Sequence, residues 1–136
     1  KDIYPSELEL KVEHSGSEAS FLCLHLTINE DIFVYKLFDK RDDFPFSIVR
    51  MPYISSNIPE SIFYSAMVGE FLRIARSTLL FTDFLPKTRE LIHRLKNQGA
   101  VEHTSIRHLR KIIQRHQDDF SHFRVETEEM LSQIFD

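Results

Sequence analysis

The first part of the chain alternates apolar and polar side chains with a period of two. Leu8, Leu10 and Val12 alternate with charged residues over positions 7–13, and a similar alternation returns over 21–28. A third run, 32–38, is rich in the aromatic and β-branched residues that strands favour. Because neighbouring side chains of a strand point to opposite faces, a period of two predicts strands. Short turns between the runs predict an antiparallel β-meander within residues 1–40.

Beyond residue 59 the apolar positions recur at helical spacing. This pattern predicts helices over 60–77, from 82 or 86 to 97, from about 104 onward, and over 125–135. Residues 116–123 fit either a break or a continuation of the third helix. Gly99 follows the second helix, where glycine commonly ends a helix. Residues 60–136 therefore predict a helical bundle of three to four helices.

A Pro-containing connection, residues 41–59, separates the two patterns. It carries Pro45, Pro52 and Pro59 and shows no helical period. Connections of this length are frequently functional. The predicted fold class is α+β, with a three-stranded antiparallel meander followed by the helical bundle.

Composition narrows the class of protein. The 136 residues are 42% apolar and 28% charged, a balance typical of one globular domain. The apolar runs are shorter than the roughly 20 residues of a membrane helix, and the start of the chain does not resemble a signal peptide. A lone Cys23 excludes an internal disulfide framework. We expect an intracellular protein, nuclear or cytoplasmic, that does not enter a membrane.

The net charge of −4 hides an uneven distribution. Residues 1–71 carry 6 basic and 12 acidic side chains, residues 72–116 carry 10 and 3, and residues 117–136 carry 1 and 6. A basic surface on successive helices suits a nucleic-acid backbone, where counterion release supplies affinity. The alternative is a solvated surface paired with the acidic tail. The residues leave both interpretations open.

Familiar catalytic motifs are missing from the sequence. Gly16, Gly69 and Gly99 are its only glycines, which excludes a Gly-rich phosphate loop, and it has no Gly-x-Ser-x-Gly elbow and no His-Glu-x-x-His. Carboxylates at 39–43 are the residue type that a two-metal site uses. Lys40 and Arg41 lie among them, however, so a charged turn is the better interpretation. The histidines lack the spacing that puts two zinc ligands on one helix face.

Several blocks resemble one family. The longest is Tyr35 to Val49 with Pro52 to Pro59, and its most specific part is Asp39-Lys40-Arg41-Asp42-Asp43-Phe44. The chain is similar in these blocks to the segment downstream of the catalytic motif in reverse transcriptases of eukaryotic retrotransposons, the Penelope-like group. Further blocks that carry the likeness are Ile3 to Leu10, Phe21 to Leu24, Tyr64, Phe71 to Arg76 and Leu95 to Gly99.

This resemblance implies that residues 7–38 are the end of a polymerase palm, with a hairpin that holds the primer end, and that 60–136 are a thumb-like bundle. It also implies that the catalytic aspartates, with their two Mg ions, belong to a parent RNA-directed DNA polymerase upstream of Lys1. Asp42 and Asp43 are not those aspartates. The chain departs from the family pattern at Cys23, Met51 and the pair 65–66.

We therefore expect no catalytic residue, no metal ligand and no cofactor in this chain. The leading hypothesis is a reverse-transcriptase module that grips a DNA or RNA primer–template through its backbone, independently of sequence. The residues expected to bind are Lys40, Arg41, Arg73, Arg76, Arg94, Arg107, Arg110 and Lys111. The alternative is a domesticated retroelement-derived domain that binds a protein partner, since the net charge is negative and the tail is acidic.

Overall fold

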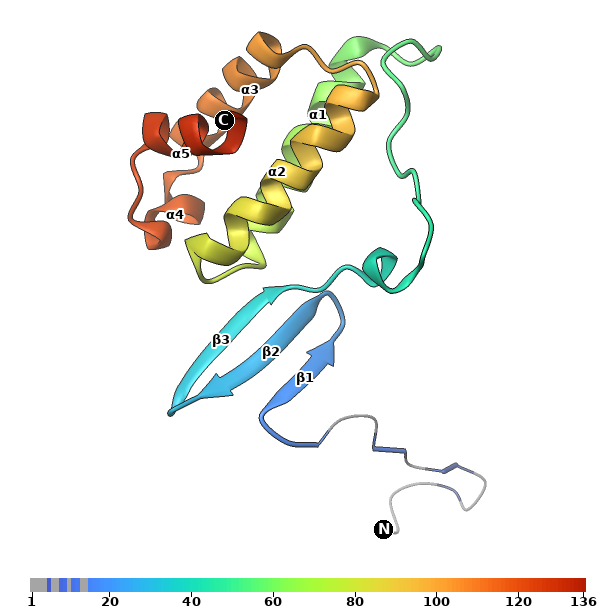
Figure 1. Cartoon of the computed structure of the whole chain (residues 1–136), viewed down its shortest axis with the longest axis vertical. Helices are drawn as coiled ribbons and strands as arrows, with labels where there is room; N and C mark the ends of the chain where they lie inside the picture. The colour runs from blue at the N-terminus through green and yellow to red at the C-terminus, as the bar shows by residue number, and fades with distance from the viewer. Residues whose placement is uncertain (1–4, 6–7, 10, 13–14) are drawn as a thin grey trace.

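A computed structural model describes residues 5, 8–9, 11–12 and 15–136. Figure 1 shows a β-sheet at one end, a helical bundle at the other, and a connection that runs beside α1 and α2. The strands are β1 (Glu18–Phe21), β2 (Leu24–Asn29) and β3 (Ile32–Leu37), paired antiparallel in the order β1-β2-β3. The predicted α+β meander followed by a helical bundle is confirmed.

The meander begins later in the chain than its sequence pattern predicts. Of the expected strand at 7–13, positions 7, 10 and 13 lie outside the described residues, and the described positions 8–9 and 11–12 are not in a strand. A tight turn at Leu22 and Cys23, with Leu22 at φ 54°, divides the expected strand at 21–28. Apolar residues occupy both faces of this stretch, so alternation does not reveal where the turn interrupts it.

One face of the sheet is apolar along its whole length. Cross-strand partners on it are Leu24 with Leu37, Leu26 with Tyr35, and Ile28 with Phe33. Leu37 is buried against the bundle, whereas Ile28 and Phe33 at the far end are exposed. The backbone N–H of Leu79 donates to the carbonyl oxygen of Tyr35 at 3.0 Å. The sheet therefore meets the helices at the end where β3 finishes.

The helical bundle contains the core. Its helices are α1 (Glu60–Arg76), α2 (Phe81–Asn97), α3 (Glu102–Arg115), the short α4 (Gln117–Phe120) with a 3-10 turn η2 (Ser121–Phe123), and α5 (Thr127–Phe135). Four phenylalanine rings form the centre of this core and are buried: Phe71, Phe84, Phe120 and Phe123. Neighbouring rings among them have centroids 4.6–6.4 Å apart. Burial of these rings removes large apolar surfaces from water and so stabilises the bundle. They are core residues and are not available to stack on a ligand.

None of the helices in the described part of the chain has the length and apolar character to cross a membrane.

Candidate functional site

The connection docks on α2 through a few specific contacts. The side-chain Nε2 of Gln98 donates to the carbonyl oxygen of Met51 at 2.8 Å, and the backbone N–H of Ile54 donates to the carbonyl oxygen of Gln98 at 3.0 Å. Gly99 has φ +100°, and a Cβ on it would lie 2.4 Å from Cγ2 of Ile54. Glycine is thus required here both by the backbone conformation and by the close approach of the connection.

A 3-10 turn, η1 (Lys40–Asp43), begins the connection and carries the Asp-Lys-Arg-Asp-Asp block. The carboxylate of Asp39 caps it, accepting the backbone N–H of Arg41 at 3.1 Å, and it also accepts two bonds from Arg41 Nε at 2.8 and 2.9 Å. These side-chain hydrogen bonds hold the pKa of Asp39 far below its usual range, against the opposing effect of burial. Arg41 is thereby fixed in position at the start of the connection.

The same arginine reaches α1 through a shared carboxylate. Glu70 accepts two hydrogen bonds from Arg73, at 2.6 and 2.9 Å, and Arg41 Nη2 lies 3.7 Å from its Oε1. The hydrogen bonds from Arg73 lower the pKa of Glu70, and the charges of Arg41 and Arg50 add to this effect. Both carboxylates of this network, Asp39 and Glu70, are largely buried. They remain charged because arginines surround them.

A second set of ion pairs joins η1 to α2. Lys87 Nζ lies 2.5 Å from Oδ2 of Asp42 and 3.5 Å from Glu90, and Arg94 Nη2 donates to Glu90 at 2.6 Å. These pairs are half-exposed, so each contributes on the order of 0.5 kcal/mol or less to stability. Their main effect is to fix where the Arg94 guanidinium lies beside the connection.

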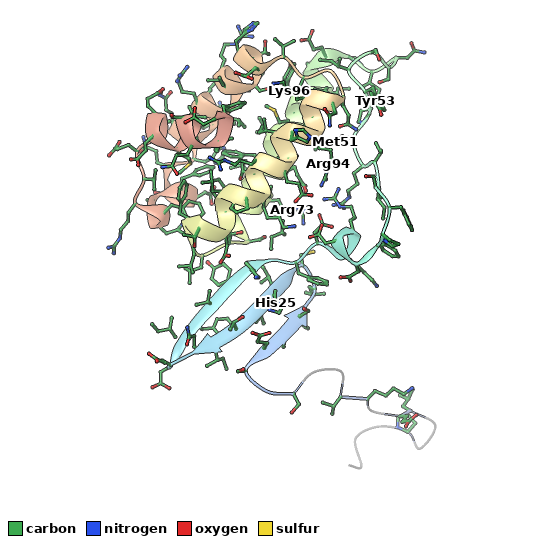
Figure 2. All side chains as sticks on the ribbon, viewed as in Figure 1. His25, Met51, Tyr53, Arg73, Arg94 and Lys96 are labelled. Atoms are coloured by element: carbon green, nitrogen blue, oxygen red, sulfur yellow. The ribbon has the colours of Figure 1, made fainter. Side chains whose placement is uncertain are left out.

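A small pocket lies between the connection and the two long helices. It encloses about 180 Å³ and is lined by three arginines (Arg41, Arg50 and Arg94), by Glu70, and by Met51, Ala66 and Leu91. We call it the arginine pocket. Its one carboxylate, Glu70, is already bound by Arg73. Figure 2 places Met51 on the connection and Arg94 on the side of α2 that faces it. Arg41 and Arg94 are themselves paired with Asp39 and Glu90, so Arg50 supplies the one positive charge in excess here.

A larger open pocket adjoins the first and shares Arg41 and Arg94 with it. It encloses about 590 Å³, and Phe44, Phe46 and Tyr53 contribute aromatic rings to its wall. We call it the aromatic pocket. These rings are 44%, 62% and 53% exposed, and Phe44 and Phe46 lie 5.4 Å apart, centroid to centroid. Asp42 and Glu90 also line it and balance the two arginines.

The structure brings together only part of the predicted basic set. Arg41, Arg73 and Arg94 lie at the connection, and Lys40 is exposed beside them on η1. Arg76 pairs with Asp119 at 2.9 Å, and Arg110 pairs with Glu128 at 2.7 Å. The remaining two, Arg107 and Lys111, are exposed on α3, which lies on the far side of the bundle from the connection (Figure 1). Two of the eight are thus engaged by the acidic C-terminal part, as the alternative interpretation of the charge pattern predicts.

Four residues of the site were not among those predicted from the sequence. They are Arg50, Phe44, Phe46 and Tyr53, all on the connection. A signal for the rings was present, because three aromatic residues in a long Pro-containing segment outside any helical or strand pattern are seldom buried together. No comparable signal marks Arg50, since its role depends on residues more distant in sequence.

Metal binding gains no support from the described part of the chain. Among the described residues no group of three or more His, Cys, Asp or Glu side chains lies close enough to hold an ion. In the 39–43 turn, Asp39 is bound to Arg41 and Asp42 to Lys87, so these carboxylates are neutralised by cations instead. They do not fit the Mg ions of a polymerase. His25 lies 3.2 Å from the hydroxyl of Ser20 and 3.8 Å from Glu18, which makes it a polar residue of the sheet surface.

Comparison with known proteins does not place the chain in a family. No protein-family model matches it, no curated protein matches it, and no solved structure matches it. Function is therefore argued from the two adjoining pockets and from the charges and rings that line them.

Proposed function

We propose that this chain is the non-catalytic C-terminal module of a retroelement reverse transcriptase and that it grips primer–template nucleic acid through the sugar-phosphate backbone. The observation that carries the proposal is the arginine pocket, in which Arg41, Arg50 and Arg94 converge from two segments of the chain. The resemblance of the Asp39 to Phe44 block to Penelope-like elements supports the assignment to a polymerase. Polymerisation itself belongs to the parent protein in this proposal.

Arginine is well suited to this role. Its planar guanidinium carries five N–H donors in a fixed fork that matches phosphate oxygens. Arg94 donates to Glu90 through Nη2, and Arg41 donates to Asp39 through Nε and Nη2, so each retains donors that no other described residue uses. The ion pairs thus orient two of the guanidinium groups while leaving capacity for a phosphate.

The contacts of this grip do not read sequence. Phosphate contacts fix the position of a protein on nucleic acid and carry no base information. If about three phosphates are neutralised, the logarithm of the affinity falls with the logarithm of the salt concentration with a slope of roughly −3 on a duplex. Binding is then strongest at low salt.

The experiment measures fluorescence anisotropy of a labelled RNA–DNA primer–template at several KCl concentrations. The test variant is Arg50→Ala with Arg94→Ala, and the matched control is Arg107→Ala with Lys111→Ala, which removes the same charge from α3. We expect the test variant to weaken binding about tenfold or more, because charge-assisted bonds to phosphate are lost, and to reduce the salt slope by about 2.

The control decides whether the pocket is the grip. It should change affinity by less than about twofold, because weak long-range attraction is all that α3 then contributes. Equal losses in both variants would mean that charge anywhere on the surface suffices. Absence of salt-dependent binding would overturn the proposed function altogether.

A protein-interaction role is the second candidate, and the sheet favours it. The far end of its apolar face, with Ile28 and Phe33, is exposed, as is Phe21 on β1. Exposed apolar patches of this kind are typical of interaction surfaces. Under this role the chain binds no primer–template, and Phe33→Ser, rather than the arginine variant, changes its association state in light scattering.

A further inference from the structure

The two pockets differ in what they select, although they share a wall. In the arginine pocket Glu70 is bound by Arg73, Arg41 is paired with Asp39 and Arg94 with Glu90, so Arg50 leaves one positive charge in excess. The aromatic pocket has Arg41 and Arg94 against Asp42 and Glu90, so its wall carries no excess of charge. A phosphate is therefore attracted to the first pocket, whereas the second gains nothing from binding an anion.

The aromatic pocket offers flat apolar surface with polar groups beside it. Phe44, Phe46 and Tyr53 are exposed, and the polar residue Asn97 lines the same wall. Aromatic rings of this kind bind planar ligands, and every nucleobase presents such a face. The volume of about 590 Å³ lies within the roughly 300–1,000 Å³ that ligand sites occupy.

The site is held in place before any ligand arrives. Met51 and Ile54 are tied to Gln98 at the end of α2, and Asp42 is paired with Lys87 of α2, so the connection is fixed to this helix on both sides of Phe44 and Phe46. A site that is already ordered loses less conformational entropy on binding. The exposed rings thus lie on a segment whose backbone is anchored at both ends.

We infer that the two pockets together bind one unpaired nucleotide of a single strand, its phosphate in the arginine pocket and its base against the rings of the aromatic pocket. The inference rests on the proposed function and deepens it, because it names a single-stranded segment, rather than the duplex alone, as what this site binds. Shared walls of Arg41 and Arg94 keep the two pockets adjacent, as a phosphate and its own base require.

The test compares three labelled probes with the whole chain at one salt concentration. They are a blunt RNA–DNA hybrid, the same hybrid with a short single-stranded extension, and a hybrid whose extension carries abasic sites. The abasic extension keeps the phosphates and lacks the bases. We expect the extension to tighten binding about tenfold and the abasic extension to lose most of that gain, because base–aromatic stacking provides it.

The variants locate the base. Phe46→Ala with Tyr53→Ala should abolish the preference for the intact extension while leaving affinity for the blunt hybrid unchanged. The matched control is Phe21→Ala with Phe33→Ala, which removes two exposed rings from the sheet and should leave the preference intact. All four rings are exposed, so these chains fold, which circular dichroism verifies. A 2-aminopurine in the extension reports stacking directly through quenching of its fluorescence.

The outcomes separate this inference from the proposed function. If the blunt hybrid and both extensions bind equally, and binding still depends on Arg50 and Arg94, the inference is overturned and the backbone grip stands. If the sheet variant removes the preference instead, the base lies elsewhere and the inference is also overturned. If no probe binds, the proposed function fails, and the rings are left as a surface for a protein partner.

Discussion

The helical bundle and the connection are stabilised by different forces. The bundle buries aromatic and aliphatic side chains such as Phe71, Phe84 and Met130 completely. The connection buries few of its own side chains, since Phe46 and Tyr53 are exposed. It is held by the ionic bonds of Arg41, by hydrogen bonds to Gln98 and by its close approach to Gly99. Hydrophobic burial tolerates changes of pH and salt, whereas charge networks do not. The bundle is therefore the scaffold, and substitutions that displace the connection should leave the bundle folded.

The largest effect should follow from opening the core. Phe84→Ala removes a ring that is fully buried among Phe71, Phe120 and Phe123, so we expect a loss of about 3–5 kcal/mol in the free energy of unfolding. Chemical denaturation measures it. The matched variant Phe46→Ala, on the connection, should cost less than about 0.5 kcal/mol. Similar losses in both would show that the connection is packed as a core segment.

A smaller effect should follow from removing the carboxylate that η1 and α1 share. Glu70→Gln leaves Arg73 and Arg41 facing a neutral amide in a largely buried position. We therefore expect the free energy of unfolding to fall by about 2 kcal/mol. The control Glu128→Gln breaks the exposed pair with Arg110, which solvent screens, and should leave the free energy of unfolding almost unchanged. The two variants are compared by urea denaturation. An equal cost would contradict the distinction between the buried network and the surface pairs.

Two glycine substitutions, one at the connection and one in the bundle, should change the free energy of unfolding in opposite directions. Gly99→Ala places a methyl group against Ile54 at a φ of +100°, so we expect a loss of about 1–2 kcal/mol. Gly69→Ala, within α1, meets no atom within 4 Å and should stabilise the chain by about 0.5–1 kcal/mol. Thermal unfolding of both variants measures the difference. The double variant Gly99→Ala with Ile54→Ala should recover part of the loss, because the contact is then relieved.

Acid should destabilise the folded chain, because the carboxyl groups of Asp39 and Glu70 have lowered pKa values. Asp39 and Glu70 have lower pKa values folded than their ordinary values of 3.8 and 4.5, so protons bind more readily to the unfolded chain in this range. Their stabilisation is complete above about pH 5 and is lost as the pH falls toward the folded values. Denaturation at pH 5 and pH 3 should show a loss of about 1 kcal/mol or more, and a smaller loss in Glu70→Gln. If the variant lost as much stability between pH 5 and pH 3 as the parent chain, Glu70 would not contribute to this pH dependence.

The helices were predictable because each carries an apolar stripe of clear period. The pattern places the first helix at 60–77, and α1 spans Glu60–Arg76; the second, expected from 82 or 86, begins at Phe81 and ends as Gly99 predicts. The strand expected at 21–28 is divided, because a positive φ at Leu22 turns the chain within what looks like one alternating run. Leucine gives no sequence signal for such a conformation, as glycine or asparagine would.

The candidate site was predictable only in part. Arg41 and Arg94 were expected from charge and from the resemblance, but their proximity depends on how the connection lies on α2. Arg50 lies beside them for the same reason, and no local sequence pattern predicts that position. Arg76 and Arg110, expected to bind a ligand, are instead paired with carboxylates of α4 and α5. Sequence gives the charges of this chain, while the tertiary fold decides which of them face one another.

The hydrogen bond from Ile54 to Gln98 has a consequence for how fast backbone amides exchange with solvent. The described residues on either side of Ile54 within the connection are mostly exposed and lie outside helices and strands. Amides in such positions exchange through small local openings, whereas the amide of Ile54 is released only when the connection leaves α2. Its protection factor is thus a single-residue report on undocking, and it can be followed while the helices stay folded.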